Sequence, residues 1–431
     1  MNAEWIAHIS LGAGIAILAS LALLFMVYRE LAPTGGLSGR GRVLLTAAVG
    51  MGVMSFATKV AALALMIAVP DMTLAPLSML HGVDRLRHTW PTANHGVATP
   101  FKPHYVWEAL PAPAAQDAER VALGERLFRD RNLSRDRSVA CASCHDVEKG
   151  AGVDGRATSE GIGGQIGNRN APTVWNAAYQ AKLFWDGRAP SLEEQAKGPP
   201  VNPTEMGMHT LEEVAARVAE NPDYRGGFGP GPLDMDRVAA AIAAYERTLV
   251  AADSPYDRFV SGDADALTPA QRRGMALFES VGCVACHYGP NFSAASRFDT
   301  RAPYRLFPAF ANDYTARYRL DRDPGKLPAG QNRGLWRVPS LRNVALTAPY
   351  FHNGSVKELE QAVRIMASGQ LGYRIVDTRS ESPAATLWSA ADGNLHQIPR
   401  RELDEAQVKD IAAFLRALSS DRLVANLGRD T

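Results

Sequence analysis

Two long apolar stretches dominate the beginning of this chain. Residues 9–28 contain no charged side chain, and residues 43–69 contain only one, Lys59. A run of about 20 apolar residues is long enough to cross the hydrocarbon core of a membrane as a helix. We therefore predict a membrane anchor of two transmembrane helices within residues 1–70, in which Lys59 either has a function or extends its amine to the membrane surface.

The charges between these stretches predict how the anchor is oriented. The connecting segment 29–42 carries Arg29, Arg40 and Arg42 against a single acidic residue, Glu30. Basic loops stay on the cytoplasmic side, so both ends of the anchor are expected outside. A cleaved signal peptide is the weaker alternative, because neither Lys nor Arg precedes the first stretch and a second stretch follows it.

After an irregular segment at residues 71–115, which we interpret as a tether, the pattern becomes helical and repeats. In each half an amphipathic segment occurs early and another one late, with apolar residues at helical spacing. The corresponding segments are 123–128 and 273–278, and then 242–249 and 411–418. The repeat predicts two mainly α-helical domains with little strand, at residues 116–260 and 261–422.

All four cysteines belong to two copies of one motif, Cys-x-x-Cys-His. The copies are Cys141-Ala-Ser-Cys144-His145 and Cys283-Val-Ala-Cys286-His287. In this motif the two thiols attach a c-type haem, and the histidine becomes an axial iron ligand. A zinc site or a redox dithiol is the weaker alternative, because the two pairs are far apart and histidine follows both. We predict two covalently bound haems c.

The haem motifs refine both the fold class and the location. A helix before each motif and a packing helix at the end of each half are typical of cytochrome c-like domains. Gly- and Pro-rich intervals such as residues 226–232 are then expected to be loops around the haems. Haem c is attached on the outer side of the bacterial inner membrane. The haem domains are therefore expected in the periplasm, in agreement with the orientation predicted for the anchor.

Five further stretches lie between and after the two haem motifs. They are 169–173 (Arg-Asn-Ala-Pro-Thr), 184–188 (Phe-Trp-Asp-Gly-Arg), 192–196 (Leu-Glu-Glu-Gln-Ala), 202–206 (Asn-Pro-Thr-Glu-Met) and 339–355 (Pro-Ser-Leu-Arg-Asn-Val-Ala-Leu-Thr-Ala-Pro-Tyr-Phe-His-Asn-Gly-Ser). With these stretches, residues 115–422 resemble the bacterial di-haem cytochrome c peroxidases. The di-haem enzymes that mature methylamine dehydrogenase belong to the same superfamily.

The resemblance implies roles around the N-terminal, peroxidatic haem. His145 would be its proximal ligand, Glu205 the distal acid–base and Gln195 the neighbour of that carboxylate. A single carboxylate over the iron can move a proton from one peroxide oxygen to the other, so that water leaves. Trp185 would conduct electrons between the haems, although interdomain packing alone would also explain it. Without the resemblance, Glu205 would be interpreted as a solvated loop residue.

The resemblance also implies the ligands of the second, electron-transferring haem and of a cation. His287 and Met366 would ligate the second iron, and a thioether ligand raises the haem potential. An isolated methionine at this spacing would otherwise be interpreted as a core residue. Asn170 and the main-chain carbonyls of Thr347 and Pro349 would hold a calcium ion between the domains.

One loop departs from the family pattern. Many members have a histidine after the first haem motif that closes the peroxidatic iron until the second haem is reduced. Here the loop 146–168 contains neither His nor Met, and Ile162 stands at the expected position. The first haem is therefore expected to be open in the oxidised state, without reductive activation.

Three functions remain in competition. The leading one is a membrane-anchored di-haem peroxidase that reduces hydrogen peroxide to water with electrons passed from a donor through the second haem. The second is a di-haem enzyme that oxidises a protein or an organic substrate through a high-valent iron state. Maturation enzymes of that kind close their second haem with tyrosine, so Met366 argues against it. The third is a non-catalytic membrane-bound electron carrier, against which Glu205 and the missing loop ligand argue.

The sequence is less specific about partners. Family members generally take electrons from a small cytochrome c or a copper protein. The two predicted membrane helices add quinol as an alternative electron donor. A homodimer is the oligomeric state that we consider. The net charge of +1, with 21% charged residues among 431, gives no indication of a nucleic-acid partner.

Overall fold

The computed structural model describes Val43 and residues 107–298, 302–330, 332–377, 386–389, 396–399 and 401–428. The two predicted transmembrane segments, Lys59 and most of the tether lie outside the described residues. Within the described ranges, no helix combines the length and the apolar character that crossing a membrane requires. The chain divides into two compact units, residues 1–90 and 91–431, and all that follows concerns the second.

Helices make up most of the regular structure, so the expected mainly helical character is confirmed. The helices are α4 Ala118–Arg129, α5 Cys141–Cys144, α6 Leu192–Ala196, α7 Gly198–Val201, α8 Leu211–Glu220, α9 Met235–Glu246, α10 Pro255–Val260, α11 Pro269–Ser280, α12 Asp313–Arg317, α13 Leu359–Gly369, α14 Glu405–Arg416 and α15 Asp421–Leu427. Short 3-10 turns occupy Arg131–Leu133, Ile162–Gly164, Ala177–Tyr179, Pro222–Tyr224, Cys283–Ala285 and Val344–Leu346.

Strands are short, as expected, and they pair only two at a time in the described residues. They are β1 Tyr304–Phe307, β2 Gly334–Arg337, β3 Arg374–Val376, β4 Thr386–Ser389, β5 His396–Pro399 and β6 Glu402–Asp404. β1 pairs with β2 and β4 with β5 in antiparallel fashion, whereas β3 and β6 are parallel. The β1–β2 ribbon belongs to the C-terminal half and carries residues that face the cavity described below.

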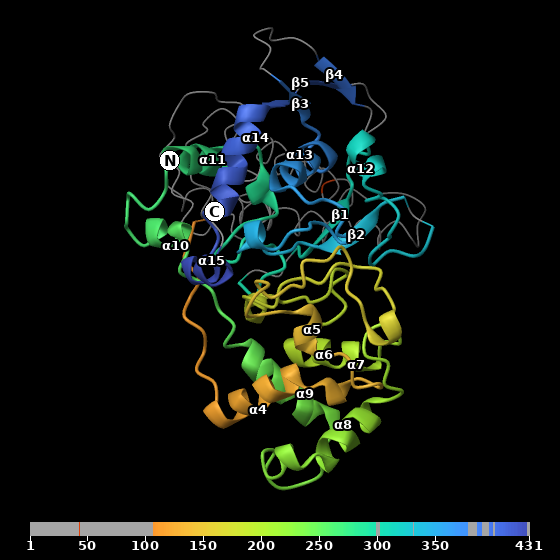
Figure 1. The fold of residues 1–431 in the computed structure, drawn as a ribbon. Helices are drawn as coiled ribbons and strands as arrows, with labels where there is room; N and C mark the ends of the chain where they lie inside the picture. The colour runs from red at the N-terminus through yellow and green to blue at the C-terminus, as the bar shows by residue number, and fades with distance from the viewer. Residues whose placement is uncertain are drawn as a thin grey trace. The chain divides into compact units, whose positions relative to one another are not determined.

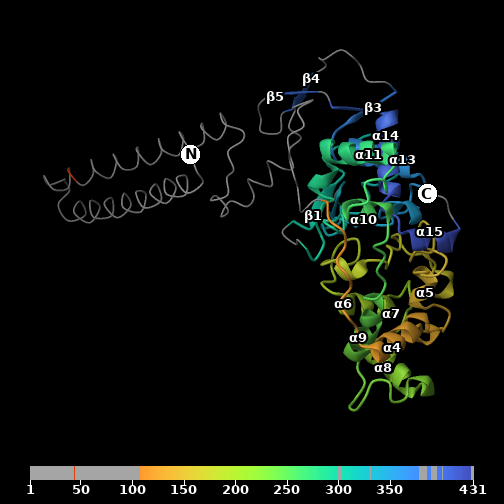
Figure 2. The same ribbon diagram turned by 90° about the vertical axis from the view of Figure 1, so that its left-hand side faces the viewer.

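Two hydrophobic cores lie in successive halves of this unit. Residues from α4, α8 and α9, among them Leu127 and Val238, form the first core. Residues from α11, α13 and α14, among them Phe278 and Phe414, form the second. Figures 1 and 2 show the same separation from two directions, with α4, α6, α8 and α9 in the lower part and α11, α13 and α14 in the upper part.

A glycine at the same position of each sequence repeat allows a close helix crossing. α4 packs on α9, and a Cβ on Gly124 would lie 1.9 Å from the carbonyl oxygen of Ala241. α11 packs on α14, and a Cβ on Gly274 would lie 1.8 Å from the carbonyl oxygen of Asp410. Because real Cβ contacts are much longer, only glycine fits at these crossings. The repeated segment therefore encodes a repeated helix pair, in which one helix precedes the Cys-x-x-Cys-His sequence of its half and the other follows it.

Candidate active site

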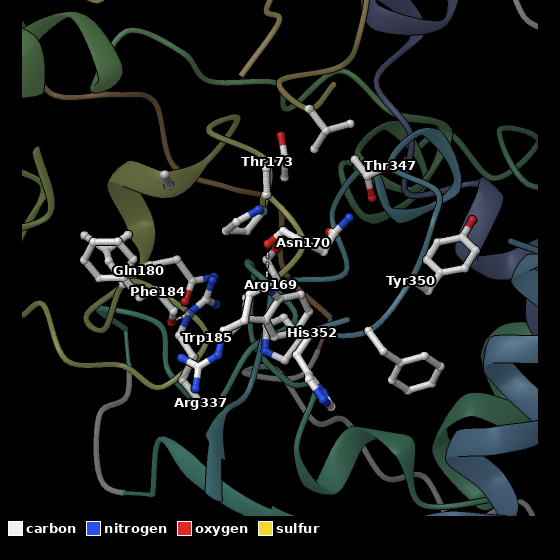
Figure 3. Close-up of a pocket in the computed structure, with 18 of the residues that line it drawn as sticks. Arg169, Asn170, Thr173, Gln180, Phe184, Trp185, Arg337, Thr347, Tyr350 and His352 are labelled. Carbon is white, nitrogen blue, oxygen red and sulfur yellow. Dashed lines mark hydrogen bonds between the residues drawn. The ribbon is translucent and has the colours of Figure 1, made fainter. Parts of the chain in front are cut away.

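One cavity of about 680 Å³ is lined by both Cys-x-x-Cys-His motifs. Most of its remaining lining is apolar, and it takes residues from both halves of the unit. Figure 3 shows part of its wall, where Asn170, Trp185, Arg337 and His352 lie close to one another. The motif residues on the wall are Cys141, Cys144, His145, Cys283, Cys286 and His287.

The motif side chains have the chemical form that haem c attachment requires. All four thiols are free, and burial raises the pKa of both Cys141 and Cys283 to about 12. Burial also lowers the pKa of both histidines, that of His287 to about 4, so the imidazoles are neutral. Nδ1 of His145 lies 3.3 Å from the carbonyl oxygen of Gly152. Nδ1 of His287 lies 3.1 Å from that of Phe292, which leaves Nε2 of each ring for iron.

Glu205 stands in a tight turn on the cavity wall rather than on a helix. The side-chain Nδ2 of Asn202 donates a 2.7 Å hydrogen bond to its Oε1, and Oδ1 of Asn202 accepts from the main chain of Thr204. Burial raises the pKa of the Glu205 carboxyl, while Arg188 and then Asn202 act to lower it. Gln195, near the end of α6, lines the same cavity.

The loop that lacks a histidine is docked onto this turn. Ile162 is buried, and its main-chain N–H donates a 2.9 Å hydrogen bond to the carbonyl oxygen of Glu205. Gly207 has a φ of +67°, and a Cβ there would lie 2.1 Å from Cδ1 of Ile162. The Nε2 of Gln165 adds a 3.1 Å hydrogen bond to the carbonyl oxygen of Pro203. In this arrangement Ile162 packs against the Glu205 turn.

Trp185 belongs to a cluster of rings on the cavity wall. Its Nε1 donates a 2.8 Å hydrogen bond to the carbonyl oxygen of Asn170. The ring centroids of Trp185 and Trp336 are 6.5 Å apart in an edge-to-face arrangement, and Trp336 stacks on His352 at 4.3 Å. The guanidinium of Arg169 covers the Trp336 ring at 5.0 Å.

Met366 comes to the second half of the cavity from α13 and lines it together with His287. After the helix, the main-chain N–H groups of Gln370 and Leu371 both donate to the carbonyl oxygen of Met366. The Nε of Arg305 on β1 lies 3.2 Å from the Sγ of Cys286. The structure therefore brings the predicted ligands of the second haem to one cavity, and a cationic side chain lies beside Cys286 of the second motif.

The three residues predicted to hold calcium also line this cavity. The Nδ2 of Asn170 donates to the carbonyl oxygens of Arg156 and Ala157, so its Oδ1 is the atom left for a cation. Thr347 and Pro349, two residues apart in the chain, line the same cavity. No group of three or more His, Cys, Asp or Glu side chains suited to a metal ion occurs in the described ranges. The calcium ion stays a prediction.

Sequence reasoning missed several polar residues of the cavity. His352, Arg337 and Glu246 all line it and are buried. The Nε of Arg337 donates to the carbonyl oxygen of Phe184 at 2.7 Å, and burial lowers its pKa to about 10. Glu246 gave no signal of burial in the sequence, because it begins the polar run Glu-Arg-Thr of the amphipathic segment 242–249.

The loop at residues 226–232 was placed wrongly around the haems. It forms a loop, but none of its residues lines the cavity. Its carbonyl groups at Phe228, Gly231 and Pro232 instead accept hydrogen bonds from Arg237 on α9. Glycine and proline predict that a segment is a loop, but they do not predict which side of a domain it lies on.

Comparisons with known proteins agree with this geometry. The family model described as "Di-haem cytochrome c peroxidase" matches residues 118–265. Cytochrome c551 peroxidase of Pseudomonas aeruginosa is 40% identical over 67% of this chain and 82% of its own length. Cytochrome c peroxidase Ccp of Escherichia coli is 36% identical over 72% of this chain, and the match spans 60% of that relative. A solved MauG-like protein associated with microbial copper homeostasis has a TM-score of 0.58 at 27% identity, covering 77% of this chain and 99% of its own.

Proposed function

The chain belongs to the di-haem cytochrome c peroxidase family, and we propose that it is a membrane-anchored, periplasmic enzyme that reduces hydrogen peroxide to water. Electrons would enter through the second haem and reach peroxide at the N-terminal haem. The observation that carries this proposal is the single cavity lined by both haem motifs, with Glu205 and Trp185 on its wall.

Free, partly buried thiols next to neutral imidazoles fit two haems c, which would be held by Cys141, Cys144 and His145 and by Cys283, Cys286 and His287. Each haem, when bound, supplies an iron that exchanges single electrons and, at an open axial position, accepts a small ligand. The residues around each motif then decide what each site does. Glu205 and Gln195 line the part of the cavity assigned to peroxide, and Met366 lines the part assigned to electron transfer.

Glu205 has the surroundings that an acid–base residue needs. The reaction requires a proton to leave one peroxide oxygen and to arrive at the other. The Asn202 amide holds Oε1 of Glu205 at 2.7 Å, so the carboxylate keeps one orientation while it accepts and returns that proton. Burial raises the pKa of this carboxyl, which makes the carboxylate a stronger base for taking the proton from peroxide than a solvated glutamate would be.

The docked loop supports a site that is open before any electron arrives. Ile162 has no atom that can ligate iron, and its main chain is bonded to the Glu205 turn. The loop residues 146–168 therefore offer no ligand that reduction would have to displace. We infer that the oxidised enzyme is ready to react with peroxide.

The apolar stretches at residues 9–28 and 43–69 support anchoring in the bacterial inner membrane, with residues 116–422 in the periplasm. A small cytochrome c or a copper protein is the proposed donor. Quinol remains the competing donor, because the anchor would place the enzyme at the membrane. Membranes that support peroxide reduction with quinol as the sole donor would favour quinol, and a strict need for added cytochrome c would exclude it.

Steady-state turnover of the purified full-length protein with peroxide and a reduced donor tests the proposal. We expect turnover in the wild type and a loss of about 10²–10⁴-fold in Glu205→Gln, the contribution typical of a positioned acid–base group. Haem content, measured on denatured protein, should be equal in both. Glu194→Gln, an exposed residue of α6, provides a matched control that should keep full activity. Electron exchange without peroxide turnover would identify a carrier instead, and peroxide-dependent oxidation of an organic substrate with no use of the donor would favour the second alternative.

A further inference from the structure

Glu246, the last residue of α9, is a buried acid for which the proposed mechanism has no use. Its side chain lines the cavity and the residue is only 4% exposed. Its Oε2 is shielded from solvent and accepts no hydrogen bond from the described residues. A buried carboxylate without a hydrogen-bond donor is strongly disfavoured, so this position favours the protonated acid.

Few charges compensate the Glu246 carboxyl. On its own helix, Arg247 is adjacent but forms a 2.6 Å ion pair with Glu193 of α6, so the two largely cancel. On α4, Arg129 and Glu125 influence the pKa of Tyr245, and neither is among the charges that shift the pKa of Glu246. On α8, Arg217 and Glu213 form a pair 3.6 Å apart, and Arg217 bonds to the carbonyl oxygen of Ser134.

The first haem motif is close enough to be influenced by this acid. After burial, the charge of Glu246 is the largest influence that raises the pKa of the Cys141 thiol. Burial also raises the pKa of Glu246 itself to about 8, with Arg247 lowering it and Glu193 raising it. A carboxyl that titrates near neutral pH beside a redox centre responds to small changes of charge at that centre.

We propose that Glu246 couples proton binding to the redox state of the N-terminal haem. When the iron gains one electron, the Glu246 carboxylate binds one proton from solvent, and when the iron loses that electron, the proton returns to solvent. The physical cause is electrostatic, because the positive charge of the oxidised haem stabilises a carboxylate and reduction removes that charge. The proposal rests on the two-haem assignment, but not on peroxide as the substrate.

Glu205 lines the same cavity but differs from Glu246 in its hydrogen bonding. Its Oε1 accepts a hydrogen bond from the amide of Asn202, which stabilises its charged form, whereas Glu246 has no such donor. Glu205 is therefore expected to keep its protonation state when the iron changes charge, apart from its part in peroxide reduction. Glu205 would thus transfer the proton during peroxide reduction, and Glu246 would bind a proton when the haem is reduced.

Redox titration of the N-terminal haem in the full-length holoprotein, at a series of pH values and without peroxide, tests this role. In the wild type we expect the midpoint potential to fall as pH rises through the neutral range. In Glu246→Gln the potential should stay nearly constant and match the low-pH limit of the wild type, because the amide is neutral at every pH. Glu205→Gln should retain the pH dependence. A dependence that survives in Glu246→Gln, or is lost in Glu205→Gln alone, would overturn the proposal.

Redox-difference infrared spectroscopy of the wild type gives a test that does not depend on how a variant folds. Reduction of the N-terminal haem should produce the C=O band of a protonated carboxyl, which shifts in D₂O and is missing from Glu246→Gln. A wild-type spectrum without this band would exclude the proposal. Neither measurement uses peroxide, so a failure here is separable from a failure of the proposed peroxidase function, which turnover assays report.

Discussion

The main-chain N–H of Ile162 donates a 2.9 Å hydrogen bond to the carbonyl oxygen of Glu205. The loop that would carry a closing ligand in related proteins is thereby attached to the turn that carries the proposed acid–base. Gly207 completes the contact, because the side chain of Ile162 occupies the space where a Cβ would stand. The turn that carries the proposed acid–base is thus bonded to a loop more than 40 residues earlier in the chain.

Gly207→Ala should disturb this contact. A Cβ at residue 207 would lie 2.1 Å from Ile162, so the loop and the turn would have to separate. Gly229→Ala is a matched control, because Gly229 has nearly the same φ, +68° against +67°, but no atom within 4 Å of the added Cβ. We expect Gly207→Ala to be about 1–3 kcal/mol less stable than the control, the usual cost of overpacking, in thermal or chemical unfolding.

Peroxide turnover should also fall in Gly207→Ala and remain at the wild-type level in Gly229→Ala, at equal haem content. Equal activity of the two variants would mean that the Ile162 contact does not position Glu205. Equal stability would mean that the loop adapts to the extra methyl group without strain.

The oxidised, resting protein should contain one high-spin and one low-spin haem. The loop 146–168 contains neither His nor Met for the first iron, whereas Met366, which lines the cavity with His287, is the proposed ligand that closes the second. Electron paramagnetic resonance of the oxidised protein checks this, and cyanide should bind to one haem without prior reduction. Met366→Ala should open the second haem and add a second high-spin signal. A wild-type spectrum with only low-spin signals would contradict the open site.

The acid side of the pH profile should depend on Glu205. The residue must be ionised to accept a proton from peroxide, so activity falls as pH decreases through its pKa. Burial raises that pKa, so the loss begins at a higher pH than for a solvated glutamate. Asn202→Ala removes the donor that stabilises the carboxylate and should move the acid limb of kcat/KM to higher pH. A limb that does not move would assign this titration to another group.

Much of the fold was predictable because the repeats carry their own signals. The segments at 123–128, 273–278, 242–249 and 411–418 fall within or overlap helices α4, α11, α9 and α14, and the family resemblance is confirmed by the comparisons. Helical spacing of apolar residues and the Cys-x-x-Cys-His motif are local patterns, so one sequence is enough to recognise them. The roles assigned to Glu205, Trp185 and Met366 came from the resemblance, and the structure adds that one cavity brings them together.

Other features were not predictable, because they depend on contacts between distant segments. The packing of Ile162 against Gly207 joins two loops, and neither loop has a pattern that indicates the other. The same holds for Trp336, which stacks on His352 and lies under Arg169. Glu246 lies in an amphipathic segment, where a polar residue is expected to face solvent, and only the structure shows that it is buried and that its Oε2 has no partner among the described residues.

Trp185 and Trp336 should differ sharply as carriers of positive charge between the haems. The Nε1–H of Trp185 donates to the carbonyl oxygen of Asn170, a contact that stabilises an indole that has lost an electron. The guanidinium of Arg169 lies over the ring of Trp336 and attracts the neutral ring by about 2 kcal/mol. This attraction is lost when the ring becomes positively charged, so oxidation of Trp336 is disfavoured. Trp185→Phe should therefore slow electron transfer between the haems, and Trp336→Phe should leave its rate almost unchanged. Rapid-mixing absorbance of the half-reduced protein measures that rate, with haem content and the rate of cyanide binding as controls. A larger effect in Trp336→Phe would reverse the assignment.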